Sequence, residues 1–500
     1  MRVRAPDFRP ELDWINTGGR RYSLADFRGR VLVLDFWTYG CINCIHMIPE
    51  LREIERRFPN EVAVVGVHSA KFPNERSTHN IARACERLGV THPVINDRQL
   101  RIWREYAINA WPTLIVISPQ SYVVAMHRGE ITAEEMAPTL EQIIDEARAA
   151  GQLQPQAAPT QSSATLPPEP SMLRFPAKLQ AADQDRLFVA DTGHHRVREI
   201  ALNATRSAGR VVRVFGCGNP GWQDGSAEDA RFRAPHGLTV ANDTVYVADT
   251  ENHLLRAIDL EAGRVSTLAG TGAQAQPFSS DGSARDTALN SPWDVLWMDE
   301  ALYVAMAGCH QLWRLDLDRS WAQAYVGSGA ERLHDAPLPE AALAQPSGLA
   351  SDGTRLYFTD PEASAIRSAH SEEGVRTLVG TGLFDSGDRD GTGDEARLQH
   401  ALGIAAWPEQ SKFLIADTYN HRIKLLDPAT RGVTAYVGSG EPGYQDGSAD
   451  DAAFWEPGGV SVSPDGRHAF VADTNNHRIR VIDLATHAVA TLSLEDANDG

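Results

Sequence analysis

The segments Ala416-Asp-Thr-Tyr-Asn-His-Arg-Ile423 and Ala472-Asp-Thr-Asn-Asn-His-Arg-Ile479 are two copies of one motif, and its recurrence decides how most of the chain folds. Two further good copies and two degenerate ones precede them, so the aspartate position falls at residues 191, 249, 306, 360, 417 and 473. The steps between these positions are 54 to 58 residues. A period of this length, with several strands in each copy, is typical of β-propeller blades. Six copies predict six blades.

Each copy is expected to supply four antiparallel strands, which in the last copy are residues 459–463, 469–472, 479–484 and 488–494. Five glycine-rich connectors join the six copies, so the count closes a ring with no strand left over. Closure is therefore expected to rest on packing of blade one against blade six, without exchange of a strand between the chain ends. Because Asp-Thr and Asn-His recur in the copies, they are interpreted as turn-holding residues rather than as a catalytic or metal site.

The first 150 residues follow a different pattern, in which apolar strands alternate with helical spacing. Residues 31–37 are a continuous apolar run, typical of a strand buried on both faces. Strand, helix, strand, helix, hairpin and terminal helix make an α/β sandwich. The polar, proline-containing stretch 151–171 is interpreted as a flexible linker. The predicted parts are thus a domain at 1–150, the linker at 151–171, a propeller at 172–494 and a tail at 495–500.

Composition and charge narrow the classes of function. The formal charge is −19, and residues 1–150 are balanced, so the acidic excess lies entirely in the rest of the chain. An acidic surface repels phosphates, so neither nucleic acid nor an anionic membrane is expected as a partner. The start of the chain lacks the apolar core of a secretory signal, and no window is apolar enough to span a membrane. With only five cysteines, the protein is expected to be cytoplasmic.

Two resemblances cover nearly the whole chain. The repeats, with Asn-His followed by an aliphatic residue, resemble NHL repeats. The first domain resembles the thioredoxin superfamily: Cys41-Ile-Asn-Cys44 follows the buried strand, Asp35 lies six residues before it, and Pro49 lies five after it. Trp111-Pro112-Thr113 precedes a strand, where the superfamily has its cis-proline loop. The chain departs from thioredoxin in the Ile-Asn pair between its cysteines and in Gly40, where tryptophan is usual.

Together these features are similar to NHL-repeat-containing proteins with an N-terminal thioredoxin-like domain. The resemblance implies a multidomain fold, an α/β thioredoxin-like sandwich followed by an all-β six-bladed NHL propeller. It also implies a redox disulfide between Cys41 and Cys44, and a substrate-binding loop at Trp111 and Pro112.

The expected chemistry is thiol–disulfide exchange. Cys41, at a helix N-terminus, is the predicted nucleophile, because unpaired N–H groups there favour the thiolate. Cys44, one turn on, is expected to resolve the mixed disulfide, with Asp35 as its proton carrier. No cofactor is expected, and no metal, since no second Cys/His pair lies at ligand spacing. His46 follows Cys44 closely and could assist proton transfer, but it is interpreted as a solvated surface histidine. Cys85 is interpreted as an inert buried thiol.

Two main hypotheses follow for the whole chain. The first is a thiol–disulfide oxidoreductase whose propeller docks or selects a protein partner. The alternative is a non-enzymatic redox-sensing or scaffold protein that uses both domains for protein–protein interaction. A weaker third hypothesis makes the propeller a hydrolase or lyase. The direction of the redox chemistry and the oligomeric state stay open.

Overall fold

A computed structural model describes residues 3–154, 171–275 and 280–496. The chain divides into two compact units, residues 1–169 and 170–500. Most of the expected linker, residues 155–170, lies outside the described residues. Its first residues pack differently from the expectation, because the Gln154 amide donates to the Gly29 carbonyl at 2.9 Å and so continues the first unit. No helix within the described ranges has the length and apolar character needed to cross a bilayer.

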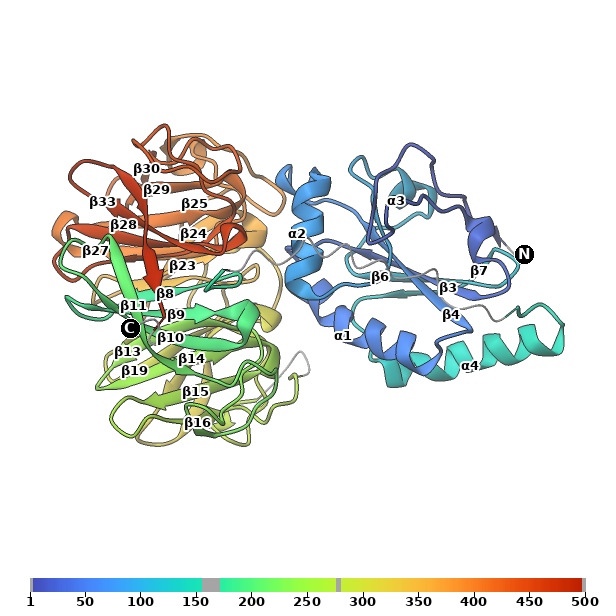
Figure 1. The fold of residues 1–500 in the computed structure, drawn as a ribbon, viewed down its shortest axis with the longest axis horizontal. Coiled ribbons are helices and arrows are strands. Elements are labelled where there is room, and N and C mark those ends of the chain that lie inside the picture. The colour runs from blue at the N-terminus through green and yellow to red at the C-terminus, as the bar shows by residue number, and fades with distance from the viewer. Residues whose placement is uncertain (1–2, 155–170, 276–279, 497–500) are drawn as a thin grey trace. The chain divides into compact units, whose positions relative to one another are not determined.

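The first unit, coloured blue to teal in Figure 1, is built on a seven-stranded sheet in the order β1-β7-β6-β3-β4-β5-β2. Strands β3, β4 and β5 run parallel to one another, β6 runs antiparallel to β3, and β7 runs antiparallel to β6. The strands are β1 Val3–Arg4, β2 Trp14–Ile15, β3 Val31–Trp37, β4 Val62–His68, β5 Val94–Asn96, β6 Thr113–Ile117 and β7 Tyr122–Arg128. The helices are α1 Ile42–Arg57, α2 Thr78–Leu88, α3 Arg101–Glu105 and α4 Ala133–Ala149.

Apolar side chains cover both faces of this sheet. On one face Val31 and Val33 of β3 pack against helices α1 and α4. On the other face Leu32, Leu34 and Phe36 pack against the N-terminal segment and α3. Every residue of β3 is buried, as the continuous apolar run predicts. The predicted α/β sandwich is confirmed.

The second unit, coloured from green to red in Figure 1, contains six sheets, each with four antiparallel blade strands, and the predicted six-bladed propeller is confirmed. From the innermost strand outward, blade one comprises β8 Leu179–Ala181, β9 Arg186–Asp191, β10 Arg196–Leu202 and β11 Ala208–Phe215, and blade two comprises β13 Pro235–Ala241, β14 Thr244–Asp249, β15 Leu254–Asp259 and β16 Arg264–Ala269. Blade three comprises β18 Pro292–Met298, β19 Ala301–Met306, β20 Gln311–Asp316 and β21 Trp321–Val326, and blade four comprises β22 Leu349–Ser351, β23 Leu356–Asp360, β24 Ala365–His370 and β25 Gly374–Val379. Blade five comprises β27 Gly403–Trp407, β28 Lys412–Asp417, β29 Arg422–Asp427 and β30 Gly432–Val437, and blade six comprises β31 Pro457–Val462, β32 His468–Asp473, β33 Arg478–Asp483 and β34 Val489–Thr491.

Connectors cover the outer edges of three blades with an extra strand. Short strands β12 (Gly225–Ser226), β17 (Gly282–Ser283) and β26 (Gly391–Thr392) pair with the outer strands β16, β21 and β30. Each belongs to the connector that precedes the blade it covers. A covered edge no longer offers free backbone groups to another chain.

Ring closure differs from the expectation, because a strand does cross between the chain ends. The expected outer strand 488–494 of blade six stops at Thr491, and β35 (Ser493–Glu495) pairs in parallel with β11 of blade one. The physical reason is the bare outer edge of β11. Among the described residues just before blade one, 171–178, no strand of this type pairs with β11, and the C-terminal segment supplies the covering strand. Residue 495, expected in the tail, belongs to this strand.

Blade six shows what the repeated aspartate does. Asp473 accepts hydrogen bonds from the Trp455 amide at 2.8 Å and from Asn476 Nδ2 at 2.9 Å. Its carboxylate also pairs with Arg480, seven residues on, at 2.9 Å, and both side chains are fully buried. The same buried pair recurs in blades one, two and four as Asp191–Arg198, Asp249–Arg256 and Asp360–Arg367.

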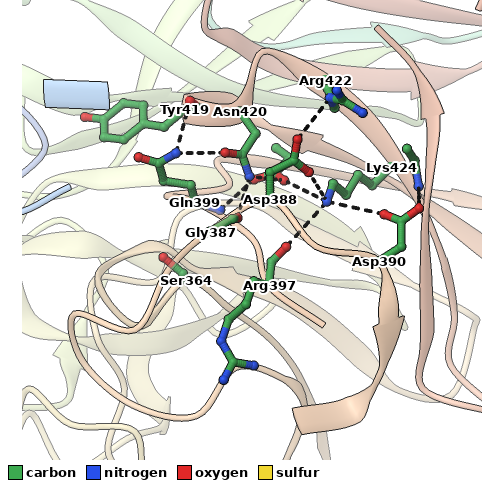
Figure 2. Close-up of polar contacts among 12 residues, drawn as sticks. Ser364, Gly387, Asp388, Asp390, Arg397, Gln399, Tyr419, Asn420, Arg422 and Lys424 are labelled. Carbon is green, nitrogen blue, oxygen red and sulfur yellow. Dashed lines mark hydrogen bonds and ion pairs between the residues drawn. The ribbon is translucent and has the colours of Figure 1, made fainter. Parts of the chain in front are cut away.

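Two blades depart from this pairing. In blade five Lys424 replaces the arginine and lies among Asp388 at 2.6 Å, Asp390 at 3.5 Å and Asp417 at 3.7 Å (Figure 2). Blade three has no ion pair at these positions, because Met306 and Trp313 replace the aspartate and the arginine and are both buried. The blade fold therefore accommodates either a buried ion pair or a pair of apolar side chains at these two positions.

The Thr and His of the motif fasten neighbouring blades. Thr474 Oγ1 donates to the Pro176 carbonyl at 2.8 Å, and His477 Nδ1 accepts from the Phe175 amide at 3.0 Å. Both contacts join blade six to the segment that leads into blade one. The histidine bonds recur between other blades as Ala234 to His195, Ser291 to His253, Gln345 to His310 and Glu456 to His421. The structural interpretation of the repeated residues is thus confirmed, although their reach between blades was not foreseen.

A buried ion pair occupies the centre of the ring. Lys178 Nζ of blade one lies 3.2 Å from Asp294 of blade three and donates to the Leu402 carbonyl, beside blade five, at 2.8 Å. Blades one, three and five are not neighbours, so these contacts span the axis. Glycines make the room: a Cβ at Gly348 would lie 3.1 Å from Lys178 Nζ, and one at Gly237 would lie 2.4 Å from Asp294 Oδ1.

Candidate active site

The two predicted cysteines lie together at the start of α1. Cys41 is the N-cap of this helix, and the amides of Cys44 and Ile45 donate to its carbonyl at 3.1 Å. Both residues are buried, with Cys41 4% exposed and Cys44 fully covered. Burial raises the pKa of Cys44 well above its usual value, and its hydrogen bond with Cys41 raises that pKa further. Cys44 is thus the thiol that needs help to ionise.

Asp35 lies on β3, within electrostatic reach of both cysteines. Its side chain is buried, and within the described parts of the chain its Oδ1 receives no hydrogen bond. Burial raises the pKa of Asp35 to about 8, and the charge of Cys41 contributes to this shift. A carboxyl group with this pKa is divided between its two forms near neutral pH and can take up or release a proton.

The predicted loop at Trp111 and Pro112 reaches the same end of the sheet. The peptide bond between them is cis, as the resemblance implied. Thr113, the next residue, pairs with Phe36 of β3, and the Pro112 carbonyl accepts from Gly129 at 2.9 Å. Since β3 leads into the cysteines, this register places the loop beside them.

Trp111 is held by three neighbours. Its Nε1 donates to the Ser69 carbonyl at 2.9 Å, and its ring lies 4.1 Å from that of Trp103. The ammonium of Lys71 lies 5.2 Å from the centre of the Trp111 ring, within the range of a cation–π contact.

Sequence reasoning missed the buried polar groups beside this site. Glu75 is fully buried and accepts hydrogen bonds from the amides of Lys71 at 2.7 Å and Phe72 at 3.1 Å, and burial raises its pKa. His68, at the end of β4, accepts from the Tyr39 amide at 3.3 Å, and burial lowers its pKa to about 3. The polar sequence around Glu75 gives no sign that this residue is buried. The apolar run that ends at His68 is a weak sign that His68 is buried.

His46 and Cys85 lie on helices α1 and α2. The side chain of His46 is 7% exposed and lies 3.0 Å from Glu130, so the prediction of a solvated histidine was wrong. The cause is the loop after β7, which folds over this face of α1. Cys85 is buried as predicted, and burial raises its pKa to about 12. Within residues 3–154, 171–275 and 280–496, no three His, Cys, Asp or Glu side chains form a group suited to a metal ion.

Fold and site together define a thioredoxin-like domain joined to an NHL-repeat propeller. The Redoxin family model matches residues 2–144, and the NHL repeat model matches residues 232–258 and 454–482. The chain is 39% identical over 521 residues to NHL repeat-containing protein 2 of Bos taurus, covering 97% of this chain and 71% of that protein. The chain belongs to the family of NHL repeat-containing protein 2.

Two further relatives show how the similarity is distributed. Protein SUPPRESSOR OF QUENCHING 1, chloroplastic, of Arabidopsis thaliana is 39% identical over 498 residues, covering 96% of this chain and 46% of that protein. Thiol-disulfide oxidoreductase ResA of Geobacillus thermodenitrificans is 30% identical over 128 residues, covering 25% of this chain and 70% of that protein. The first relative matches both domains, and the second matches only part of the chain.

Proposed function

We propose that the protein is a thiol–disulfide oxidoreductase that acts on a protein substrate. The observation that carries this proposal is the constellation at the start of α1. It comprises a thiol at the helix N-terminus, a second thiol in hydrogen-bond contact with it, and a buried carboxyl group with a pKa of about 8. Similarity of 25% of the chain to a thiol-disulfide oxidoreductase supports it.

The exchange runs in two balanced steps. The Cys41 thiolate attacks one sulfur of a substrate disulfide, forming a mixed disulfide and releasing the other substrate sulfur as a thiolate. Cys44 then gives its proton to the Asp35 carboxylate and attacks Cys41 Sγ. The Cys41–Cys44 disulfide forms and the second substrate thiolate leaves, so two electrons pass from the dithiol to the substrate. The reverse sequence oxidises a substrate dithiol.

We propose further that the propeller docks or selects the protein partner. Its centre is filled by Lys178 and Asp294, and its repeated motif is engaged in holding blades together. These observations favour binding to the outer surfaces of the blades over chemistry in an axial channel.

A redox-sensing role is the second candidate, and the burial of both thiols favours it. Since Cys41 is only 4% exposed, small oxidants reach it more easily than a folded protein does. In that case the disulfide would form without a substrate protein.

Trapping separates the two functions. Cys44→Ser leaves Cys41 able to form a mixed disulfide that cannot be resolved, so substrate proteins should accumulate on Cys41 in cell extract. The matched control is the Cys41→Ser/Cys44→Ser double variant, which keeps Cys85, Cys217 and Cys309. Specific proteins bound to the single variant and absent from the control support the oxidoreductase. Equal capture by both variants would contradict it.

A further inference from the structure

The loop that follows β4 lies beside the site. Strands β3 and β4 are parallel, with Trp37 opposite His68, so the chain leaves both strands at the same edge of the sheet. The Ser69 amide donates to the Trp37 carbonyl at 2.8 Å, which anchors the start of the loop. Glu75 fixes its middle by accepting the amides of Lys71 and Phe72. Lys71 therefore starts from a rigid backbone position.

The side chain of Lys71 is also held in place. It is half-buried, and its ammonium lies over the ring of Trp111, the residue before cis-Pro112. Trp111 in turn is fixed by Ser69 and Trp103. A long side chain that is clamped at both ends keeps its charge at one place, here at the edge that carries the cysteines.

The charged and titratable groups around this edge come from every neighbouring element. They are Asp35 of β3, Cys41, Cys44 and His46 of α1, His68 of β4, Glu75 of the loop, Arg87 of α2 and Glu130 after β7. Arg87 lies over Tyr39, and Glu130 is paired with His46. Burial is the main cause that raises the pKa of Cys44, and Cys41 and Asp35 raise it further, whereas the charge of Lys71 lowers it.

We propose, on the basis of the function proposed above, that Lys71 is a positioning residue for the second step of the exchange. Its ammonium, held over Trp111, stabilises the thiolate of Cys44 while this sulfur attacks Cys41 Sγ in the mixed disulfide. The proton of Cys44 passes to Asp35, and Lys71 keeps its own proton throughout. The positive charge thus offsets the burial of Cys44 at the moment when its thiolate is needed.

The test measures the two steps separately with 5,5′-dithiobis(2-nitrobenzoate) on the reduced full-length protein. Attack by Cys41 releases one thionitrobenzoate, and resolution by Cys44 releases a second, so absorbance at 412 nm reports two phases. In the Cys44→Ser variant the mixed disulfide on Cys41 cannot be resolved, so any thionitrobenzoate released after the first phase comes from the other cysteines. Rates are taken from pH 6 to 10.

In Lys71→Met the pH profile of the second phase should move up by about one unit, the scale of the effect of one nearby opposite charge on a pKa. At pH 7 this makes resolution about tenfold slower, with the first phase changed less than twofold. Lys71→Arg should restore the profile. Arg20→Met is the matched control, because it removes a cation 4.7 Å from the Tyr22 ring in the same domain.

An unchanged second phase in Lys71→Met would overturn the proposal, as would equal slowing of both phases. Lys71→Gln serves as a second neutral variant if the methionine variant does not fold. Absence of a second phase in the unmodified protein contradicts the proposed oxidoreductase itself, and this outcome is distinct from the loss of a Lys71 effect.

Discussion

Replacing Arg480 by methionine tests how the buried ion pairs hold the blades. The guanidinium is fully buried and binds Asp473 at 2.9 Å and Asp446 at 2.7 Å. It also donates to the carbonyls of Ala453 at 2.7 Å and Gln445 at 2.6 Å. Methionine fills much of the same space but forms none of these bonds.

The expected loss of stability follows from the Asp473 carboxylate, which stays buried after Arg480 is replaced. Asp473 remains buried, with Trp455 and Asn476 as donors but without its cation. Breaking a buried ion pair by removing one partner costs about 3–5 kcal/mol. At an m-value of about 3 kcal/mol per molar urea, the unfolding midpoint of the propeller should fall by about 1 to 1.7 M.

Blades three and five supply matched controls from the chain itself. Arg480→Lys copies Lys424 and keeps a cation, so its midpoint should fall between those of Arg480→Met and the unmodified protein. Asp473→Met/Arg480→Trp copies the apolar pair Met306 and Trp313 and leaves no buried charge. This double variant should be more stable than Arg480→Met, since replacing both partners of a buried pair costs less than removing one.

Pulsed thiol labelling in urea measures this loss in the full-length protein. Cys309 reports on the propeller and Cys85 on the first domain, and burial raises the pKa of both thiols to about 12, which slows labelling of the folded protein. The Cys309 midpoint should shift while the Cys85 midpoint stays. If Arg480→Met is as stable as the double variant or more so, the reasoning is refuted.

Two further predictions use the same readout. Asp35→Asn should stabilise the first domain by about 4 kcal/mol at pH 7, because a pKa of about 8 lies well above the unfolded value. As pH rises from about 4 to about 8, the unfolded chain loses the Asp35 proton while the folded chain keeps it, so the unmodified protein loses stability. The gain in stability from Asp35→Asn, measured at Cys85, should therefore be smaller at pH 5 than at pH 8. An equal gain at both pH values contradicts the assignment. Deleting residues 493–496 should speed amide exchange in β11 and leave β16, covered by β12, unchanged. Unchanged exchange in β11 would show that β35 does not protect it.

The fold was predictable where its signal is local or periodic. The spacing of the motif predicted six blades, and the apolar run 31–37 predicted a strand buried on both faces. Ring closure was not predictable, because residues 493–495 read as a continuation of the strand before them, and their partner β11 lies far away in sequence. The arginine seven residues after the aspartate was a missed signal, since it recurs in four blades.

The residues of the site likewise fall into those that the local sequence predicts and those that it does not. Cys41, Cys44 and Asp35 lie within ten residues of one another, so their spacing along a strand and a helix start brings them together. Lys71 and Glu75 reach the site through a loop whose shape depends on hydrogen bonds to Trp37 and to the loop backbone. Such a path leaves no periodic trace in the sequence.

The strand β35 also sets the order in which the propeller can be finished during synthesis. The β11 strand ends at Phe215, and its covering strand begins at Ser493. At about 5–20 residues per second, β11 waits on the order of 15 to 60 s for its partner after leaving the ribosome. For that time the outer edge of blade one can pair with other nascent chains, and a chaperone that covers this edge would prevent such pairing.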